Sequence, residues 1–326
     1  MEMLAAAPLI AIEDFPAPTG AEARWLEAAD GARLRIVCWR PEAAHIDHCR
    51  GTVFLFGGRT EFAEKYFEVV GELIDRGFAV ATMDWRGQGL SARMLDDPRK
   101  GHIDDFATFD RDLVLFMAEI APSFPKPWIA MAHSMGGNIL LRAVHDHPDW
   151  FDGAVFSAPM LGLRLGSALN AFAATMLATC GSLLGFATHY IPGGGPAAAD
   201  EEAFEDNIVT SDEKRHAIHQ ALLRADPALG LGAATFGWVR AAIRSIKMTA
   251  RPDYLGAVRL PVLIAEATKD QLVWGGALEN AVRHMPNAEL IRVEGSQHEI
   301  LMERDVLRAV FWQAFDRFAE RIAPQR

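Results

Sequence analysis

An apolar run that meets a glycine-rich turn and then a helical pattern constrains the fold of this chain more than any other stretch. Trp128–Ala132 has the length and composition of a buried parallel strand. Gly136 and Gly137 follow closely, and apolar residues then recur at helical spacing until Pro148. Ser134 falls at the turn, where a tight strand-to-helix bend holds a serine Oγ clear of the backbone. The stretch therefore predicts a nucleophile elbow, with a plain helix cap as the alternative role for Ser134.

The elbow is one unit in a longer alternation of strands and helices. Helical patterns separate several of the apolar runs, and glycine or proline ends many of them. Strands are predicted at Trp25–Ala28, Leu34–Trp39, Thr52–Phe56, Phe78–Met83, Trp128–Ala132, Ala154–Ser157, Val262–Glu266 and Glu289–Val293. Helices are predicted at Phe62–Arg76, Asp104–Ile120, Gly276–His284 and Asp305–Ile322, besides the one that follows Ser134.

Between residues 160 and 256 the alternation stops, and only helical stretches remain. One is Asp212–Arg224, after a capping box of Thr210 and Glu213, and another is Trp238–Lys247. We therefore expect an α/β fold with a mostly parallel central sheet, helices on both faces, and a helical lid inserted over the strands' carboxyl ends. The expected division is core at 1–159, cap at 160–256 and core again at 257–326.

Charge and cysteine content exclude several classes of partner. The formal net charge of −11 argues against nucleic-acid binding and against electrostatic attachment to anionic membranes. Cys38, Cys49 and Cys180 lack metal-binding spacing and suggest a reducing compartment or buried thiols. In Met1–Ile12, Glu2 stands where a signal peptide carries positive charge. We therefore predict no signal peptide and a cytoplasmic location.

Residues 165–199 contain no Lys, Arg, Asp or Glu. The apolar part, Leu165–Ile191, is long enough to span a bilayer. It is, however, rich in Ala, Gly, Ser and Thr, carries Asn170 and His189, and lacks flanking clusters of Lys and Arg. We therefore expect a buried or interfacial helix pair here, and disfavour a membrane span.

A serine hydroxyl is a poor nucleophile near neutral pH unless a base accepts its proton and a third group orients the base. In this strand order the acid and then the histidine should follow later strands. Asp270 follows Val262–Glu266 by a few residues, with Glu266 as the fallback acid. His298 follows Glu289–Val293 in the same way and is the predicted base. The remaining histidines show no ligand spacing, so we predict no metal site.

Two backbone N–H groups are needed to stabilise the negative charge that develops on an attacked carbonyl. Met135, the residue after the serine, should supply one. The loop after Thr52–Phe56 should supply the other, and we assign it to Arg59 because Gly57-Gly58 lets the backbone approach closely. Asp84–Ser91 is interpreted as a structural loop that braces the site, since its Gly-x-Gly pattern alone is weak evidence for phosphate binding.

Together these residues resemble the α/β-hydrolase fold, and more narrowly its lysophospholipase and monoacylglycerol lipase branch. Two positions depart from the family pattern: Gly57 stands where the family has histidine, and Ala132 replaces the first glycine of the elbow. Both are small residues, so we expect altered tuning rather than lost activity. The matching pieces are Gly58–Glu61, Asp84–Ser91, His133–Gly137, Asn207–Asp212, Gly237-Trp238, Asp270 and His298–Leu301.

The resemblance implies a serine ester hydrolase that needs no cofactor, with Ser134 as nucleophile, His298 as base and Asp270 as orienting acid. Water would be the acceptor and a glycerol-linked fatty acyl ester the substrate, with transient contact between cap and lipid surface. The uncharged cap suits an acyl chain, with ordinary packing against the core as an equal alternative. The expected substrate-binding residues are Phe172, Met176, Leu183, Phe186 and Trp238.

Two other functions stay open. The same scaffold supports small-ester hydrolysis or acyl transfer to another acceptor. Relatives of this fold that use aspartate as nucleophile, such as epoxide hydrolases, are disfavoured by Ser134 at the elbow. A catalytically silent binding protein is less favoured still, because the Ser–Asp–His order is intact.

Overall fold

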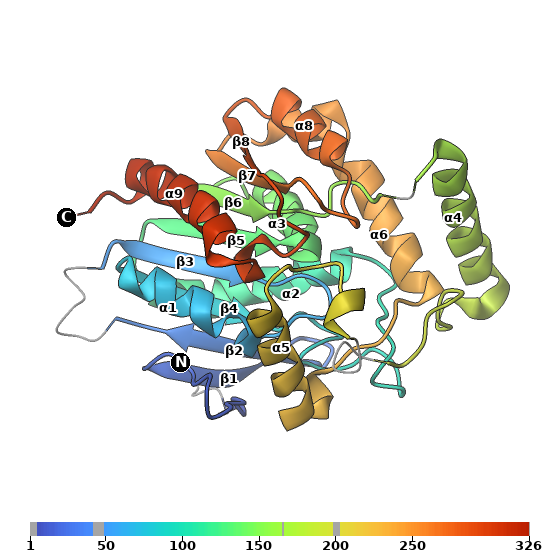
Figure 1. The fold of residues 1–326 in the computed structure, drawn as a ribbon, viewed down its shortest axis with the longest axis horizontal. Helices are drawn as coiled ribbons and strands as arrows, with labels where there is room; N and C mark the ends of the chain where they lie inside the picture. The colour runs from blue at the N-terminus through green and yellow to red at the C-terminus, as the bar shows by residue number, and fades with distance from the viewer. Residues whose placement is uncertain (1–4, 42–48, 165, 198–202, 326) are drawn as a thin grey trace.

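The computed structural model describes residues 5–41, 49–164, 166–197 and 203–325. Glu2 of the signal-peptide prediction and Leu165 at the start of the apolar stretch lie outside the described residues. One sheet of eight strands organises the described chain, in the order β1-β2-β4-β3-β5-β6-β7-β8 (Figure 1). Its strands are β1 (Ala21–Glu27), β2 (Arg33–Trp39), β3 (Gly51–Phe56), β4 (Phe78–Met83), β5 (Trp128–His133), β6 (Gly153–Ser157), β7 (Val262–Ala267) and β8 (Ala288–Val293).

All eight predicted strands are present, with ends that differ by a few residues at most. β2 pairs antiparallel with both β1 and β4, and the pairs from β4 to β8 are parallel. The parallel strands β3 to β7 are almost wholly buried. This is why they read as continuous apolar runs rather than as an alternating pattern. The mostly parallel α/β sheet predicted from the sequence is confirmed.

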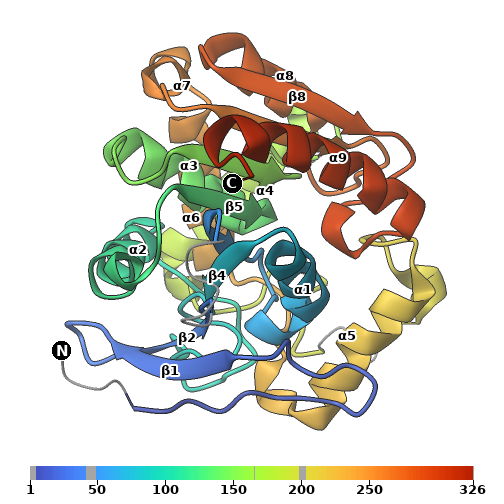
Figure 2. The ribbon, with the colours of Figure 1, turned by 90° about the vertical axis from the view of Figure 1, so that its left-hand side faces the viewer.

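Side chains of successive strand residues point to opposite faces and build two cores. In β3, Val53 and Leu55 join one core, whereas Phe54 and Phe56 join the other. α1 (Phe67–Asp75) and α9 (Asp305–Ile322) pack on the first face. α2 (Ala107–Glu119), α3 (Ser134–Asp146) and α8 (Gly275–His284) pack on the second. Figure 2 shows α1 and α9 on one side of the sheet and α2 and α3 on the other.

The segment between β6 and β7 is a helical insertion that carries α4 (Ala168–Gly181), α5 (Glu213–Ala225), α6 (Phe236–Thr249) and α7 (Pro252–Ala257). α4 continues directly into a π-helical turn, Ser182–Phe186. Figure 1 shows α4 outermost beside α6 at one end of the sheet, with α5 apart from both.

Two predictions about the insertion need correction. The expected buried or interfacial helix pair is a single kinked helix, and it is not buried: only 11% of Leu169–Phe186 is buried, although its length and composition would allow it to cross a membrane. Its apolar side chains face outward because the helix rests on α6 along a narrow face of small residues. The interfacial alternative stays a prediction. The predicted capping box is also wrong: Asp212 caps α5 by accepting from the N–H of Arg215, while the hydroxyl of Thr210 donates to the carbonyl of Met302.

Candidate active site

Ser134 is the first residue of α3 and stands directly after β5. Its φ angle of 47° lies in the left-handed region that residues with a side chain rarely adopt. Gly136 makes this bend possible, because a Cβ there would lie 2.8 Å from the carbonyl oxygen of Phe56 and closer still to that of Gly57. Helix and strand therefore approach each other more closely than any residue larger than glycine permits. The predicted elbow is thus present as a backbone feature.

The structure brings Ser134, His298 and Asp270 together. The Nε2 atom of His298 lies 2.8 Å from the Oγ of Ser134, and its Nδ1 lies 2.6 Å from Oδ2 of Asp270. The other carboxylate oxygen of Asp270 accepts from the N–H groups of Leu272 and Val273, at 2.7 and 2.9 Å. The carboxylate is therefore held by its own loop and presents one oxygen to the imidazole.

The fallback acid, Glu266, lies elsewhere. It belongs to β7, as its position in the sequence indicates, and Arg292 donates to its carboxylate at 2.9 Å. Burial alone would raise the pKa of Asp270, but the hydrogen bonds and charge of His298, with the two backbone amides, outweigh burial and lower that pKa. Asp270 is therefore ionised near neutral pH and can stabilise a positive charge on His298.

His133 precedes the serine and contacts His298, with ring centroids 4.7 Å apart. Its Nδ1 lies 3.0 Å from the carbonyl oxygen of Ser157. Burial lowers the pKa of His133, although Glu61 opposes this. The His133 ring is thus neutral near pH 7 and adds no second positive charge beside His298.

Met135 and Arg59, the predicted oxyanion donors, both line the cavity beside Ser134. Met135 is the second residue of α3, so its N–H has no acceptor four residues earlier in the helix. Arg59 stands on the loop after β3. A Cβ on the neighbouring Gly58 would lie 3.1 Å from the Cβ of Ser134, which shows how closely this loop approaches the serine.

A buried cluster of charged groups supports this loop. Glu61 accepts hydrogen bonds from the N–H of Gly58 and from the hydroxyl of Tyr66. Lys65 lies 2.9 Å from Glu61 and 2.5 Å from Glu299, the residue after His298. Burial raises the pKa of Glu61, but the charge of Lys65 and the other donors outweigh it and hold that pKa well below its usual range. Lys65 therefore ties the loop after β3 to the loop that carries His298.

The sequence analysis gave none of these four residues (Glu61, Lys65, Tyr66 and Glu299) a role at the site. A signal was available, because a Glu–Lys pair four residues apart marks neighbours on a helical turn. The partner Glu299 carries no local signal, since it lies far away in the sequence.

The loop at Asp84–Ser91 contacts the loop after β3, as predicted. Trp85 Nε1 donates to the carbonyl of Gly57 at 2.8 Å, and Gln88 Nε2 donates to those of Gly58 and Glu61 at 2.6 and 3.0 Å. These bonds fix the carbonyl side of the loop, while the N–H groups of Gly58 and Thr60 donate to the side chains of Glu61 and Gln88. The prediction of a bracing loop is confirmed.

A cavity of about 630 Å³ opens beside Ser134. Most of its wall is apolar and comes from the helical insertion and from the loops after β6 and β7. The apolar residues that line it are Met160, Leu163, Ala174, Leu177, Ala178, Ile191, Pro192, Val209, Ala233, Ala234, Phe236, Trp238, Val239 and Leu272. A cavity of this size and lining suits a small molecule with an apolar part.

Only one of the five predicted substrate-binding residues, Trp238, lines this cavity. The structure places Phe172, Met176, Leu183 and Phe186 outside the lining, with 40% to 70% of each side chain exposed. The reason is helical geometry: Ala174, Leu177 and Ala178 share the one face of α4 that turns inward.

No cluster of three or more potential metal ligands occurs in the part of the chain that the structure describes. Cys38 and Cys49 are buried free thiols, and Cys180 is an exposed one.

Comparisons with known proteins identify the family of this chain. Residues 47–305 match the family described as serine aminopeptidase, S33. The chain is 30% identical to lysophospholipase L2 of Escherichia coli over 90% of this chain and 85% of that one. It is 29% identical to the probable lysophospholipase L2 of Haemophilus influenzae, over 82% of each chain.

Among solved structures, a soluble variant of monoglyceride lipase from Saccharomyces cerevisiae, in complex with a substrate analogue, shares the fold. The TM-score is 0.70, with 19% identity, and the match covers 93% of this chain and 97% of that one. The α/β-hydrolase fold is thus shared over most of the chain. The chain belongs to the serine aminopeptidase S33 family of α/β-hydrolases.

Proposed function

We propose that this protein hydrolyses single-acyl lipid esters, namely lysophospholipids or monoacylglycerols, through an acyl-enzyme intermediate on Ser134. The chain is a carboxylic ester hydrolase by its family and its relatives. One observation carries the finer proposal: the Ser134–His298–Asp270 chain of hydrogen bonds opens into a largely apolar cavity. Water-soluble small esters would not need so large an apolar wall.

In the proposed mechanism, His298 accepts the proton of Ser134 as the serine Oγ attacks the ester carbonyl carbon. The N–H groups of Met135 and Arg59 stabilise the oxyanion that forms. Collapse of this intermediate breaks the bond to the glycerol oxygen, which leaves with the proton held by His298. Water, deprotonated by His298, then attacks the acyl-serine, and a second collapse returns the proton to Ser134 and releases the fatty acid.

We also propose that the helical insertion, at 160–256, acts as a cap between two parts of the core, 1–159 and 257–326. Residues of α4 and α6 line the cavity on one side, while Ser134 and His298 line it on the other. The exposed apolar side chains of α4 suit transient contact with a lipid surface, because burying each in lipid would be favourable by about 1.5–3 kcal/mol. A cytoplasmic enzyme that meets lipid surfaces peripherally fits this arrangement.

The test is turnover of decanoyl lysophosphatidylcholine and of monodecanoylglycerol, each below its aggregation concentration, measured as fatty acid released. The proposal expects hydrolysis of at least one lipid and a covalent acyl adduct on Ser134 in rapidly quenched samples. Cleavage of neither lipid, together with turnover of p-nitrophenyl acetate above p-nitrophenyl decanoate, would favour a small-ester hydrolase instead.

A further inference from the structure

Arg59 extends its side chain along the wall of the cavity. Its guanidinium donates from Nη2 to the carbonyl of Gly232 at 2.6 Å and lies 5.3 Å from the ring centroid of Trp238. Gly101 makes room for it, because a Cβ there would collide with the Arg59 guanidinium. Two segments far apart in the chain, at Gly101 and at Gly232 to Trp238, thus surround this cation.

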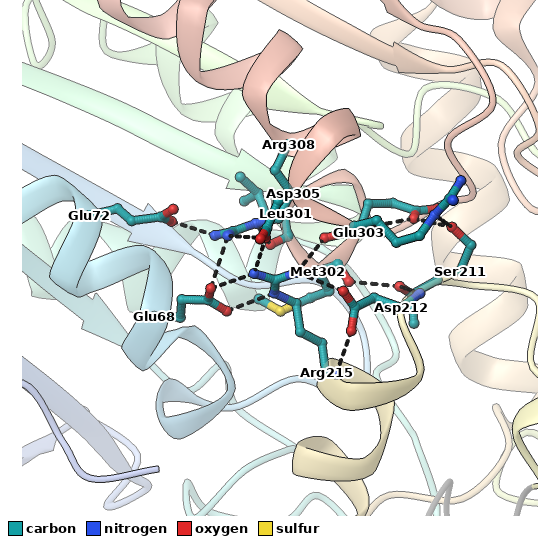
Figure 3. A network of polar contacts seen from close by, with 12 residues as sticks. Glu68, Glu72, Ser211, Asp212, Arg215, Leu301, Met302, Glu303, Asp305 and Arg308 are labelled. Carbon is teal, nitrogen blue, oxygen red and sulfur yellow. Dashed lines mark hydrogen bonds and ion pairs between the residues drawn. The ribbon is translucent and has the colours of Figure 1, made fainter. Parts of the chain in front are cut away.

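Several other buried cations of the fold have carboxylate partners. Arg35 is fully buried between Glu64 and Asp84, and Lys65 lies between Glu61 and Glu299. Figure 3 shows a further cluster, in which Arg215 and Arg308 contact carboxylates of the set Glu68, Glu72 and Asp305. The fold therefore usually neutralises a positive charge that it removes from water, as the cost of burying an unpaired charge requires.

Arg59 differs from these cations. It forms no ion pair with any residue that the structure describes, and its Nε is buried without a hydrogen-bond partner. Burial lowers the pKa of Arg59 to about 10, so the side chain stays positively charged near pH 7. Arg93 also lacks an ion pair in the described chain, but it donates to three carbonyl oxygens and does not line the cavity.

The other charges at the cavity wall are already balanced. Glu61 and Glu299 share Lys65, and Asp270 faces His298 from behind. Arg59 is thus the one lining cation without an anion among the residues described. A bound ligand that carries a negative charge would supply the missing partner.

We infer that Arg59 binds the phosphate of a single-chain phospholipid, so that the cavity favours a lysophospholipid over a monoacylglycerol. This inference rests on the proposed function and deepens it. A guanidinium presents parallel N–H donors that match two phosphate oxygens, and such charge-assisted bonds are stronger than neutral ones. A monoacylglycerol offers only neutral hydroxyl groups at the same place and would leave Arg59 unpaired.

The position of Arg59 in the chain also fits this role. Its backbone N–H is the proposed donor to the ester oxyanion, while its side chain reaches Trp238 along the wall. In a lysophospholipid the phosphate is one glycerol unit away from the ester carbonyl. One residue can therefore contact both ends of that glycerol unit, and the apolar wall at Leu163, Leu177 and Leu272 is left for the acyl chain.

The test compares kcat/KM for decanoyl lysophosphatidylcholine with that for monodecanoylglycerol in the wild type, Arg59→Met and Arg59→Lys. All three proteins keep the backbone N–H at position 59, the proposed donor to the oxyanion. The ratio should fall about 10- to 100-fold in Arg59→Met, the loss of a charge-assisted hydrogen bond, and recover partly in Arg59→Lys. An equal loss on both substrates in Arg59→Met would overturn the inference, as would a wild type that shows no preference for the phospholipid.

A second measurement needs no turnover of lipid. Labelling of Ser134 by a fluorophosphonate probe is followed in the presence of dodecylphosphocholine, of monododecyl glycerol ether or of inorganic phosphate. Arg59→Met should lose protection by dodecylphosphocholine at least tenfold more than protection by the ether. Equal losses would overturn the inference, and so would protection by inorganic phosphate alone that equals protection by dodecylphosphocholine.

The two assays separate the two levels of the proposal. If the wild type cleaves neither lipid, the proposed function fails. If it cleaves monoacylglycerol and Arg59→Met changes neither the ratio nor the protection, only the role of Arg59 fails. Because labelling requires an intact elbow and base, any variant that is still labelled has folded at the site.

Discussion

The Nε2 atom of His298 lies 2.8 Å from the Oγ of Ser134, although 164 positions separate the two residues in the chain. With His298 as the base, Ser134→Ala removes both the attacking oxygen and the proton that the base accepts. We expect kcat for ester hydrolysis to fall on the order of a millionfold, as for a serine protease that loses its nucleophile. The measurement is release of decanoate from either lipid substrate, with enzyme purified from a strain that lacks contaminating esterase.

Ser157→Ala is the matched control. Ser157 is also buried, stands at the end of the neighbouring strand β6, and has a hydroxyl without a hydrogen-bond partner. Its removal should therefore leave turnover within a few-fold of the wild type. A Ser134→Ala protein that keeps more than a thousandth of the activity would show that the nucleophile is another group.

Asp270 and Glu266 are separated by only four positions, yet only Asp270 contacts His298. Asp270→Asn keeps the shape of the side chain but replaces the acceptor toward Nδ1 and removes the negative charge, which disfavours the imidazolium. We expect kcat to fall on the order of 10⁴-fold, with a smaller change in KM. The assay is steady-state kinetics above pH 7.

Glu266→Gln tests the same assignment from the other side. Glu266 pairs with Arg292 at 2.9 Å and belongs to a strand rather than to the loop after it. This variant should keep nearly full activity. If Glu266→Gln were the more damaging substitution, the acid would be misassigned.

Sequence patterns predicted the sheet because its buried strands have a pattern that fits no other element. Apolar runs such as Phe78–Met83 are buried on both faces and are too short for helices, so their ends are fixed within a residue or two. The positions of Ser134, Asp270 and His298 followed from the strands that precede them. Local order along the chain was enough, because the carboxyl ends of parallel strands meet at one edge of the sheet.

Other features depend on contacts that no local pattern contains. Lys65 and Glu299 are 234 positions apart, and the hydroxyl of Thr210 is taken by a carbonyl 92 positions away rather than by the next helix. The exposure of α4 could not be predicted either, because an apolar helix has the same sequence pattern whether it packs in a core or faces outward. These features arise from the packing of the insertion on the sheet.

Two glycines separate the effect of close packing from the effect of helix propensity. Gly136→Ala puts a Cβ against backbone carbonyls of Phe56 and Gly57, which cannot move without shifting β3. We expect the free energy of unfolding to fall by about 1–3 kcal/mol. Gly71→Ala, in α1, meets no atom within 4 Å outside its own helix, and should raise that free energy by about 0.5–1 kcal/mol.

Urea unfolding, followed by circular dichroism, measures both variants against the wild type. The two substitutions are chemically identical, so a difference in sign reports only the surroundings. A neutral or stabilising Gly136→Ala would contradict the close approach of helix and strand at the elbow.

His219 makes stability depend on pH. It lies on α5 with its ring stacked on that of Phe62, 5.4 Å between centroids, and its Nδ1 is buried without a hydrogen-bond partner. Burial, reinforced by the charge of Lys65, holds the pKa of His219 well below 6.5 in the folded state. As the pH falls below about 6.5, His219 therefore binds a proton in the unfolded chain but stays neutral in the folded chain.

The sign follows from this difference. Above about pH 6.5, His219 is neutral in both the folded and the unfolded state and does not affect the free energy of unfolding. Below that pH, the free energy of unfolding falls by up to about 1.4 kcal/mol per pH unit until the pKa of His219 in the folded state is reached. Between pH 7.5 and 5.5, His219→Leu should lose about 1 kcal/mol less than the wild type in urea unfolding. Parallel pH profiles for the two proteins would show that His219 does not titrate on unfolding.

The exposed apolar side chains of α4 and of the π-helical turn that follows it allow a prediction about lipid surfaces. Leu169 and Leu184 are each 74% exposed and do not line the cavity. If these side chains enter a lipid surface, each leucine contributes about 1.5–3 kcal/mol of transfer free energy. Leu169→Ser with Leu184→Ser should then lower hydrolysis of substrate held in neutral phosphatidylcholine vesicles at least tenfold, while hydrolysis of monomeric p-nitrophenyl butyrate changes little.

Val306→Ser, at a side chain 68% exposed on α9, is the matched control and should affect neither rate. Neutral vesicles neither attract nor repel this chain of net charge −11, so burial of apolar side chains is the attraction that the assay measures. Equal vesicle rates for the double variant and the wild type would therefore mean that α4 stays in water during turnover.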